Sequence, residues 1–208
     1  MEKQKDFDDL IQSHRLIPLY TVHELSCIDR LSKILIKSEL LLIEVALRTP
    51  KALEAIRLLS KSKKICVGAG TVRSVDDVKK AVTAGAKFIV CPSVNSEVIE
   101  YCINNHIAVY PGIATPTELQ LVWQYGLRVA KFFPAEAYGG VPTIKALSGP
   151  YYDMKFLPTG GIDSHNYQEY LSLDAVAAVG GSFIISEKML FQKDDSSIIA
   201  YITHLLEN

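Results

Sequence analysis

Short apolar runs alternate with amphipathic stretches along the whole chain. The runs are rich in branched and aromatic residues and predict buried strands at 16–20, 40–45, 64–69, 88–91, 107–110, 127–132, 155–158 and 175–179. The stretches between them have helical periodicity and predict helices at 23–37, 51–62, 75–84, 95–105, 116–125, 140–147, 164–171 and 195–206. A further helix is expected near 5–13, before the first strand.

Several residues at the ends of these stretches are typical helix boundaries. Ser74 stands where an N-cap belongs, and Thr49-Pro50 and Thr115-Pro116 read as an N-cap followed by proline. Gly85 and Gly126 fall where a helix ends in a left-handed cap. These signals agree with the alternation of strands and helices.

Eight strands that alternate with eight helices in 208 residues indicate a parallel α/β fold. The count favours a (β/α)8 TIM barrel with an additional N-terminal helix. The alternative is a doubly wound open sheet with two extra strands. Because no linker, low-complexity segment or block of charge divides the chain, we expect one domain over residues 1–208.

Composition narrows the classes of function. With 49% hydrophobic residues, 22% charged residues and a formal net charge of -1, the chain has no global field that would draw it to nucleic acid or to an anionic membrane. No apolar run approaches the roughly 20 residues of a membrane span, and no signal-peptide core follows Met1, so we expect a cytoplasmic protein. The four cysteines are scattered without ligand spacing, which predicts neither a metal site nor a disulfide.

Lys131 lies in the middle of the apolar run at 127–132. A lysine is almost never fully buried unless it is paired or functional. Burial favours the neutral amine, which is the form that attacks a carbonyl to make a Schiff base. The alternative is a lysine at the strand end whose ammonium reaches solvent.

Glu44 is a second ionisable residue within an apolar strand, and Arg48 follows it on the next loop. Strand alternation places Glu44 on the same face as Leu42, and Lys131 on the same face as Val129. If both side chains face the interior, each explains the burial of the other. A structural ion pair without catalysis would follow the same pattern.

Glycine pairs follow the last two predicted strands, at Gly160-Gly161 and Gly180-Gly181. Backbone N–H groups at these positions form the usual phosphate site of such barrels, and Ser182 adds a hydroxyl. A neutral lysine, a carboxylate, an arginine and this anion site together suit a ketone substrate that carries a carboxylate and a phosphate. Taken alone, these features also have structural explanations: Arg48 as an ordinary surface residue, and the glycine pairs as ordinary turns.

Five segments carry a resemblance to a known family. They are Glu44-Val45-Ala46-Leu47-Arg48-Thr49-Pro50, Gly68-Ala69-Gly70-Thr71-Val72, Pro111-Gly112-Ile113-Ala114-Thr115-Pro116-Thr117-Glu118, Lys131-Phe132-Phe133-Pro134-Ala135-Glu136 and Pro158-Thr159-Gly160-Gly161-Ile162. In order and spacing, over roughly residues 15–185, the chain resembles the 2-keto-3-deoxy-6-phosphogluconate (KDPG) aldolases, whose bifunctional relatives also cleave 4-hydroxy-2-oxoglutarate (KHG). The resemblance implies a class I aldolase without metal or other cofactor, usually a homotrimer, whose partner is a small-molecule substrate.

The resemblance also implies a role for each matching residue. Lys131 would form the Schiff base with pyruvate, and Glu44 would be the general acid and base. The expected substrate-binding residues are Arg48 and Thr71 at the pyruvate carboxylate, Pro92 and Phe133 along the pocket, and Gly160, Gly161 and Ser182 at the phosphate.

Three departures from the family pattern concern substrate preference. Ala46 stands where many relatives have threonine, Cys91 replaces a common serine, and Tyr20 is expected to narrow the mouth of the site. The presence of Arg48 argues against membership in the sister branch of this family, which acts on the galactonate analogue of KDPG. Two other functions remain open from the residues alone: a phosphosugar isomerase or epimerase that uses Glu44 without a covalent intermediate, and a non-catalytic barrel that binds a phosphorylated metabolite.

Overall fold

The computed structural model describes residues 2–207. All paired strands run parallel. The strands are β1 (Leu16–Tyr20), β2 (Leu42–Ala46), β3 (Cys66–Gly70), β4 (Phe88–Val90), β5 (Ala108–Tyr110), β6 (Gly112–Ile113), β7 (Val129–Phe132), β8 (Lys155–Pro158) and β9 (Val179–Gly181). The order along the chain confirms the predicted alternation of strands with helices.

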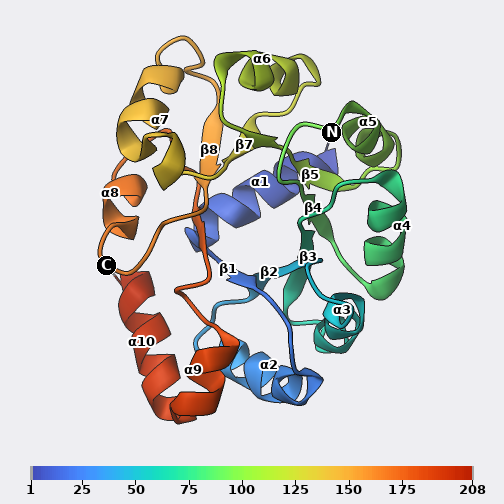
Figure 1. The fold of residues 1–208 in the computed structure, drawn as a ribbon, viewed down its shortest axis with the longest axis vertical. Helices are drawn as coiled ribbons and strands as arrows, with labels where there is room; N and C mark the ends of the chain where they lie inside the picture. Colours follow the sequence, from blue (N-terminus) through green and yellow to red (C-terminus); the bar gives the residue numbers. More distant parts are fainter. Residues whose placement is uncertain (1, 208) are drawn as a thin grey trace.

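The helices surround the strands, with α1 lying across the middle of the ring in this view (Figure 1). They are α1 (Glu2–His14), α2 (Ile28–Lys37), α3 (Ala52–Ser60), α4 (Val75–Ala84), α5 (Ser96–Asn104), α6 (Pro116–Gln124), α7 (Gly140–Ser148), α8 (Tyr167–Leu171), α9 (Glu187–Gln192) and α10 (Asp195–Glu207). Short 3-10 helices span Leu25–Cys27 and Glu136–Tyr138. Within residues 2–207, no helix combines the length and apolar character that crossing a membrane requires.

The expectation of a closed eight-stranded TIM barrel is wrong. The hydrogen-bonded strands form a six-stranded sheet in the order β5-β4-β3-β2-β1-β9 and a separate three-stranded sheet in the order β6-β7-β8. One division falls at Pro111, which separates β5, paired with β4, from β6, paired with β7, and which has no N–H to donate to a ladder. The second division between the sheets falls between β8 and β9. Of the predicted strand at 175–179, Val179 alone belongs to β9. Isolated bridges at Phe156–Val176 and Thr159–Gly180 join this region to β8 and the turn after it.

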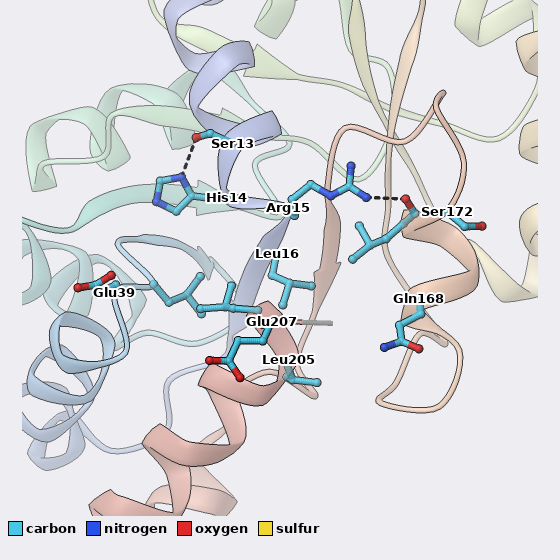
Figure 2. Close-up of a pocket in the computed structure, with 12 residues that line it drawn as sticks. Ser13, His14, Arg15, Leu16, Glu39, Gln168, Ser172, Leu205 and Glu207 are labelled. Carbon is cyan, nitrogen blue, oxygen red and sulfur yellow. Dashed lines mark hydrogen bonds between the residues drawn. The ribbon is translucent and has the colours of Figure 1, made fainter.

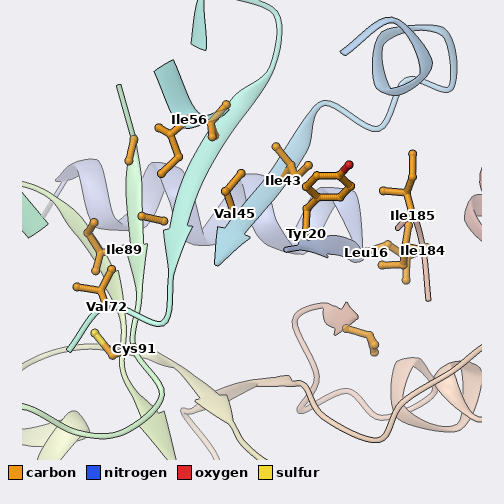
Figure 3. Close-up of a cluster of buried hydrophobic side chains, with 14 of the residues drawn as sticks. Leu16, Tyr20, Ile43, Val45, Ile56, Val72, Ile89, Cys91, Ile184 and Ile185 are labelled. Atoms are coloured by element: carbon orange, nitrogen blue, oxygen red, sulfur yellow. The ribbon is translucent and has the colours of Figure 1, made fainter. Parts of the chain in front are cut away.

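Alternate residues of most strands, among them β1, β4, β5 and β8, enter two different apolar clusters. The larger cluster lies between the strands and the outer helices, and Figure 3 shows part of it, including Tyr20, Ile43 and Cys91. The smaller cluster includes Leu42 and Val129 and lies on the opposite face of the strands. Glu44 and Lys131 have the same strand parity as these two residues, so they face the interior.

Helix α1 covers the interior at the ends where the strands begin. Its Ile11 is fully buried within the smaller cluster, and the Phe7 ring lies 6.0 Å from the ring of Phe88 on β4. This helix therefore closes the end of the interior opposite to the predicted site.

Candidate active site

Lys131 and Glu44 meet in the interior, on strands from the two different sheets. The Lys131 ammonium Nζ lies 3.2 Å from Glu44 Oε1, and the two side chains are 4% and 1% exposed. The second carboxylate oxygen, Glu44 Oε2, is buried and has no hydrogen-bond partner among the described residues. One oxygen thus orients the amine while the other is left to act on a ligand.

Glycines on the neighbouring strand β3 leave the space that Glu44 occupies. In the parallel ladder, Glu44 pairs with Gly68 and Ala46 pairs with Gly70. A Cβ at Gly70 would lie 2.0 Å from Glu44 Oε1 and 2.7 Å from its Cδ, which is too close for either atom to stay in place. The carboxylate reaches Lys131 because β3 has no side chain at this point.

A buried ion pair of this kind is weak support for stability. Removing two charges from water costs several kcal/mol per ion, and well-packed apolar residues often stabilise a protein equally or better. The surroundings of Lys131 add little polarity, since the Phe133 ring centroid lies 5.4 Å from its Nζ. The pair therefore fits a chemical role better than a structural one.

Arg48 and Thr71 come together at the ends of β2 and β3. Arg48 Nε donates a hydrogen bond to Thr71 Oγ1 at 3.3 Å. Thr71 has a φ of 59°, a left-handed conformation that a β-branched residue rarely adopts. Such strain is concentrated at functional sites, where the surrounding structure maintains it. The exposed Arg48 guanidinium is open to an anionic ligand.

Pro92 and Phe133 lie after the ends of β4 and β7, and both are half-buried. Gly112 lies between Pro92 and Lys131. It pairs with Lys131 in the ladder between β6 and β7, and its Cα faces the Pro92 carbonyl. A Cβ at Gly112 would lie 2.4 Å from Pro92 O. Phe133 in turn packs on Gly160, where an added Cβ would lie 3.2 Å from the ring.

The predicted anion site is formed by two turns at adjacent strand ends. Gly160 and Gly161 follow β8 with φ values of 99° and 80°, which only glycine adopts readily. The Thr159–Gly180 bridge aligns this turn with the end of β9, after which Ser182 is exposed. The structure thus places Gly160, Gly161 and Ser182 on one side of the same end of the strands as Lys131.

Thr159 is a candidate residue that sequence analysis missed. It is 1% exposed, and its Oγ1 has no hydrogen-bond partner among the described residues. Its parity with Leu157, a member of the smaller cluster, directs it toward the interior. A buried polar atom without a partner is a signal of ligand binding, but it depends on the pairing of β8 with β9 and is not visible in the sequence.

The three departures from the family pattern have different surroundings. Ala46 has the parity of Glu44 and faces the interior. Tyr20 and Cys91 instead belong to the larger cluster, so Tyr20 does not narrow the mouth (Figure 3). Burial raises the pKa of the Cys91 thiol to about 12, which keeps this thiol protonated at neutral pH.

A cavity of about 660 Å³ lies near the ends where β1 and β2 begin, away from the candidate site. Figure 2 shows residues that line it. Its lining includes Arg15 and Glu39, which precede β1 and β2, and Glu207 at the end of α10. Arg15 reaches across to the Leu171 carbonyl and donates a hydrogen bond to it. None of the predicted site residues lines this cavity, so its size does not bear on the candidate site.

Known proteins share both the sequence and the fold of this chain. A family model described as "KDPG and KHG aldolase" matches residues 7–202. The 2-dehydro-3-deoxy-phosphogluconate aldolase of Dickeya dadantii is 36% identical over 194 residues, which cover 93% of this chain and 91% of that protein. The KHG/KDPG aldolase of Escherichia coli K12 is 36% identical over 179 residues, 86% of this chain and 84% of the relative.

A solved structure supports the same relationship. The KDPG aldolase of Legionella pneumophila, in which pyruvate was captured at low pH as a covalent carbinolamine intermediate, superposes with a TM-score of 0.91. It is 36% identical, and the match covers 96% of this chain and 97% of that one. Similarity of this extent in sequence and in structure shows that the chain belongs to the KDPG and KHG aldolase family.

Proposed function

We propose that this protein is a class I aldolase that reversibly cleaves 2-keto-3-deoxy-6-phosphogluconate to pyruvate and glyceraldehyde 3-phosphate. The observation that carries the proposal is the buried contact of 3.2 Å between Lys131 Nζ and Glu44 Oε1. A lysine held in an apolar interior beside one carboxylate is equipped to form a Schiff base and to exchange protons with the bound substrate. Family membership supports this reaction over the isomerase and the non-catalytic barrel.

The reaction uses the amine as nucleophile and the carboxylate as proton carrier. Lys131 Nζ attacks the C2 ketone, and the resulting carbinolamine loses water to give an iminium ion. The iminium accepts the electron pair of the C3–C4 bond as that bond breaks, while Glu44 takes the proton of the C4 hydroxyl and the aldehyde leaves. Glu44 then returns the proton to C3 of the enamine, and hydrolysis of the pyruvate iminium frees Lys131.

The remaining predicted residues hold the two ends of the substrate. Arg48 and Thr71, joined by their 3.3 Å hydrogen bond, would bind the pyruvate carboxylate, because a guanidinium presents parallel donors to a carboxylate. Pro92 and Phe133 would line the apolar middle of the pocket. Gly160, Gly161 and Ser182 would bind the phosphate through backbone N–H groups and a hydroxyl.

A second activity, cleavage of 4-hydroxy-2-oxoglutarate to pyruvate and glyoxylate, uses the same pyruvate half of the site. The E. coli relative is named for both activities. The glycine turns after β8 and β9 favour the phosphorylated substrate, since a glyoxylate product makes no use of a phosphate site. We therefore propose KDPG cleavage as the main reaction.

We further propose that the protein is a single domain over residues 1–208 and works as a homotrimer in the cytoplasm. The proposal of a trimer rests on the family resemblance. With a chain mass of 23.0 kDa, three copies give about 69 kDa. Sedimentation equilibrium should therefore fit a single species near this mass, and a species near the chain mass at working concentrations would refute the trimer.

Borohydride reduction in the presence of pyruvate tests the reaction itself. Reduction should trap a pyruvyl adduct that peptide mapping places on Lys131, and Lys131→Ala should abolish both the adduct and turnover, the latter by roughly 10⁴-fold or more. Lys145→Ala, which removes an exposed lysine, should retain both. A folded wild type that gives no adduct in excess pyruvate would refute the Schiff base.

A further inference from the structure

Glu136 ends the segment that begins with Lys131, yet the reaction above gives it no part. Its backbone N–H donates a hydrogen bond to Gly160 O at 3.1 Å, next to a bond of 2.9 Å from Ala135 N to Thr159 O. The chain after β7 therefore remains attached to the turn after β8. This attachment places Glu136 directly beside the predicted phosphate turn.

The side chain of Glu136 lies between two glycine turns. A Cβ at Gly161 would lie 2.5 Å from Glu136 Cβ, and a Cβ at Gly140 would lie 3.3 Å from Glu136 Oε1. Gly161 and Gly140 have positive φ values of 80° and 56°. The stem of Glu136 thus packs on the phosphate turn, while its carboxylate faces the first residue of α7.

Tyr170 on α8 fixes the carboxylate in this place. Its hydroxyl donates a hydrogen bond to Glu136 Oε1, and its ring is 1% exposed. The same hydroxyl also lies against Gly140, where a Cβ would come within 2.8 Å of it. Burial, and then the hydrogen bond to Glu136, raises the pKa of Tyr170, so the hydroxyl remains a donor at neutral pH.

The charge of Glu136 cannot be what helps a phosphate to bind, because a nearby carboxylate repels an anion. The contacts of its stem and of its oxygen are geometric, and they join three segments: the turn after β8, the start of α7, and the buried ring on α8. Backbone N–H groups bind a phosphate well only when they are held in the correct direction before binding.

We propose that Glu136 and Tyr170 form a positioning pair that holds the Gly160-Gly161 turn in the conformation that binds the substrate phosphate. The identity of that ligand rests on the proposed function; the role of the pair as a brace of the turn rests on the contacts above. Neither residue touches the reacting atoms. Their loss should weaken phosphate binding while leaving pyruvate chemistry intact.

Tyr170→Phe and Glu136→Ala test the pair, with glycerol 3-phosphate as the probe in calorimetry and KDPG as substrate. Each variant should weaken glycerol 3-phosphate binding and raise the KM for KDPG by about tenfold, the scale of one lost hydrogen bond to a charged group. Pyruvate trapping by borohydride and kcat should stay within about twofold. Glu136→Gln keeps the stem and an oxygen acceptor, so it should restore binding.

Two control variants isolate the effect. Tyr167→Phe removes another buried hydroxyl of α8, one that donates to Leu205 O at 3.4 Å, and Glu169→Ala removes an exposed carboxylate next to Tyr170. Both should bind glycerol 3-phosphate as the wild type does. Equal losses in Tyr170→Phe and Tyr167→Phe, or a parallel loss of pyruvate trapping, would overturn the proposal. A wild type that traps no pyruvate would instead refute the proposed function, while the calorimetry would still report on the pair.

Discussion

Glu44 keeps its position because Gly70, on the adjacent strand, has no side chain. An added methyl group would lie 2.0 Å from Glu44 Oε1. We expect Gly70→Ala to displace the carboxylate and to lower kcat by about 10²- to 10⁴-fold, the range for loss of a general acid and base. Steady-state kinetics should therefore show a loss similar to that of Glu44→Gln.

A matched glycine separates this effect from a general cost of adding a methyl group. Gly149 follows α7, and a Cβ there would meet only the Ala146 carbonyl at 3.6 Å. Gly149→Ala should keep wild-type kcat. If Gly70→Ala had full activity, the carboxylate position described here would be wrong.

Single residues were predictable where strand parity alone decides their direction. Leu42 and Val129 turn out to face the interior, and so Glu44 and Lys131 meet there as their spacing indicated. Gly70 and Thr159 matter because of the residues opposite them on neighbouring strands. Register between strands is set by packing over long sequence separations, so these two roles were not visible in the sequence.

At the scale of elements, part of the family-like sequence proves to be helix capping. The segment from Pro111 to Glu118 contains β6 and the first residues of α6. Glu118 Oε2 accepts hydrogen bonds from Ala114 N at 2.9 Å and from Thr115 N at 2.9 Å, and Thr115 Oγ1 accepts one from Glu118 N. This reciprocal capping box fixes the helix start and requires no catalytic role for either residue.

Removal of this cap should therefore affect stability and not chemistry. Glu118→Ala leaves two backbone N–H groups without their acceptor and should lower the free energy of unfolding by about 1–2 kcal/mol, with kcat unchanged. Urea denaturation and steady-state kinetics measure the two quantities. Glu97→Ala is the control, since Glu97 lies in the first turn of α5 and is exposed. A drop in kcat for Glu118→Ala at saturating substrate would contradict a purely structural role.

Local sequence signals predicted where most helices lie, but they did not predict which strands pair. The predicted helix at 75–84 agrees with α4, which starts at the Ser74 capping box and ends at Gly85 with a φ of 113°. By contrast, Thr49 does not cap α3: the helix begins at Ala52 with Lys51 at its N-cap position, and the Thr49 hydroxyl donates a hydrogen bond to Val22 O. Helix α9, at Glu187–Gln192, is short and its few periodic positions gave no signal.

At the scale of the whole molecule, the number of βα units was a good guide to the layers and a poor guide to closure. The alternation predicted parallel strands enclosed by helices, as observed. Closure depends on a continuous ladder around all strands. Pro111 interrupts it on one side, and the region before Val179 contributes isolated bridges on the other. A count of strands contains no information about such interruptions.

Helix α1 connects the stability of the whole fold to pH through Asp8. Burial raises the pKa of Asp8 from 3.8 to about 6, although the hydrogen bond of 2.8 Å from Gln4 acts in the opposite direction. Between these two values the folded protein holds a proton that the unfolded chain releases. The stability that Asp8 contributes is therefore complete below pH 3.8 and is lost as the pH rises through about 6.

Asp8→Asn removes this titration. The free energy of unfolding of Asp8→Asn relative to the wild type should rise between pH 4 and pH 7, by on the order of 1 to 2 kcal/mol once solvent screening at a half-buried position is allowed for. Urea unfolding at a series of pH values measures this difference. Because α1 packs on the far end of the interior from Lys131, kcat should be equal in wild type and variant. If the free energies of unfolding of wild type and Asp8→Asn changed with pH by the same amount across this range, the Asp8 carboxyl would not be buried in the folded protein.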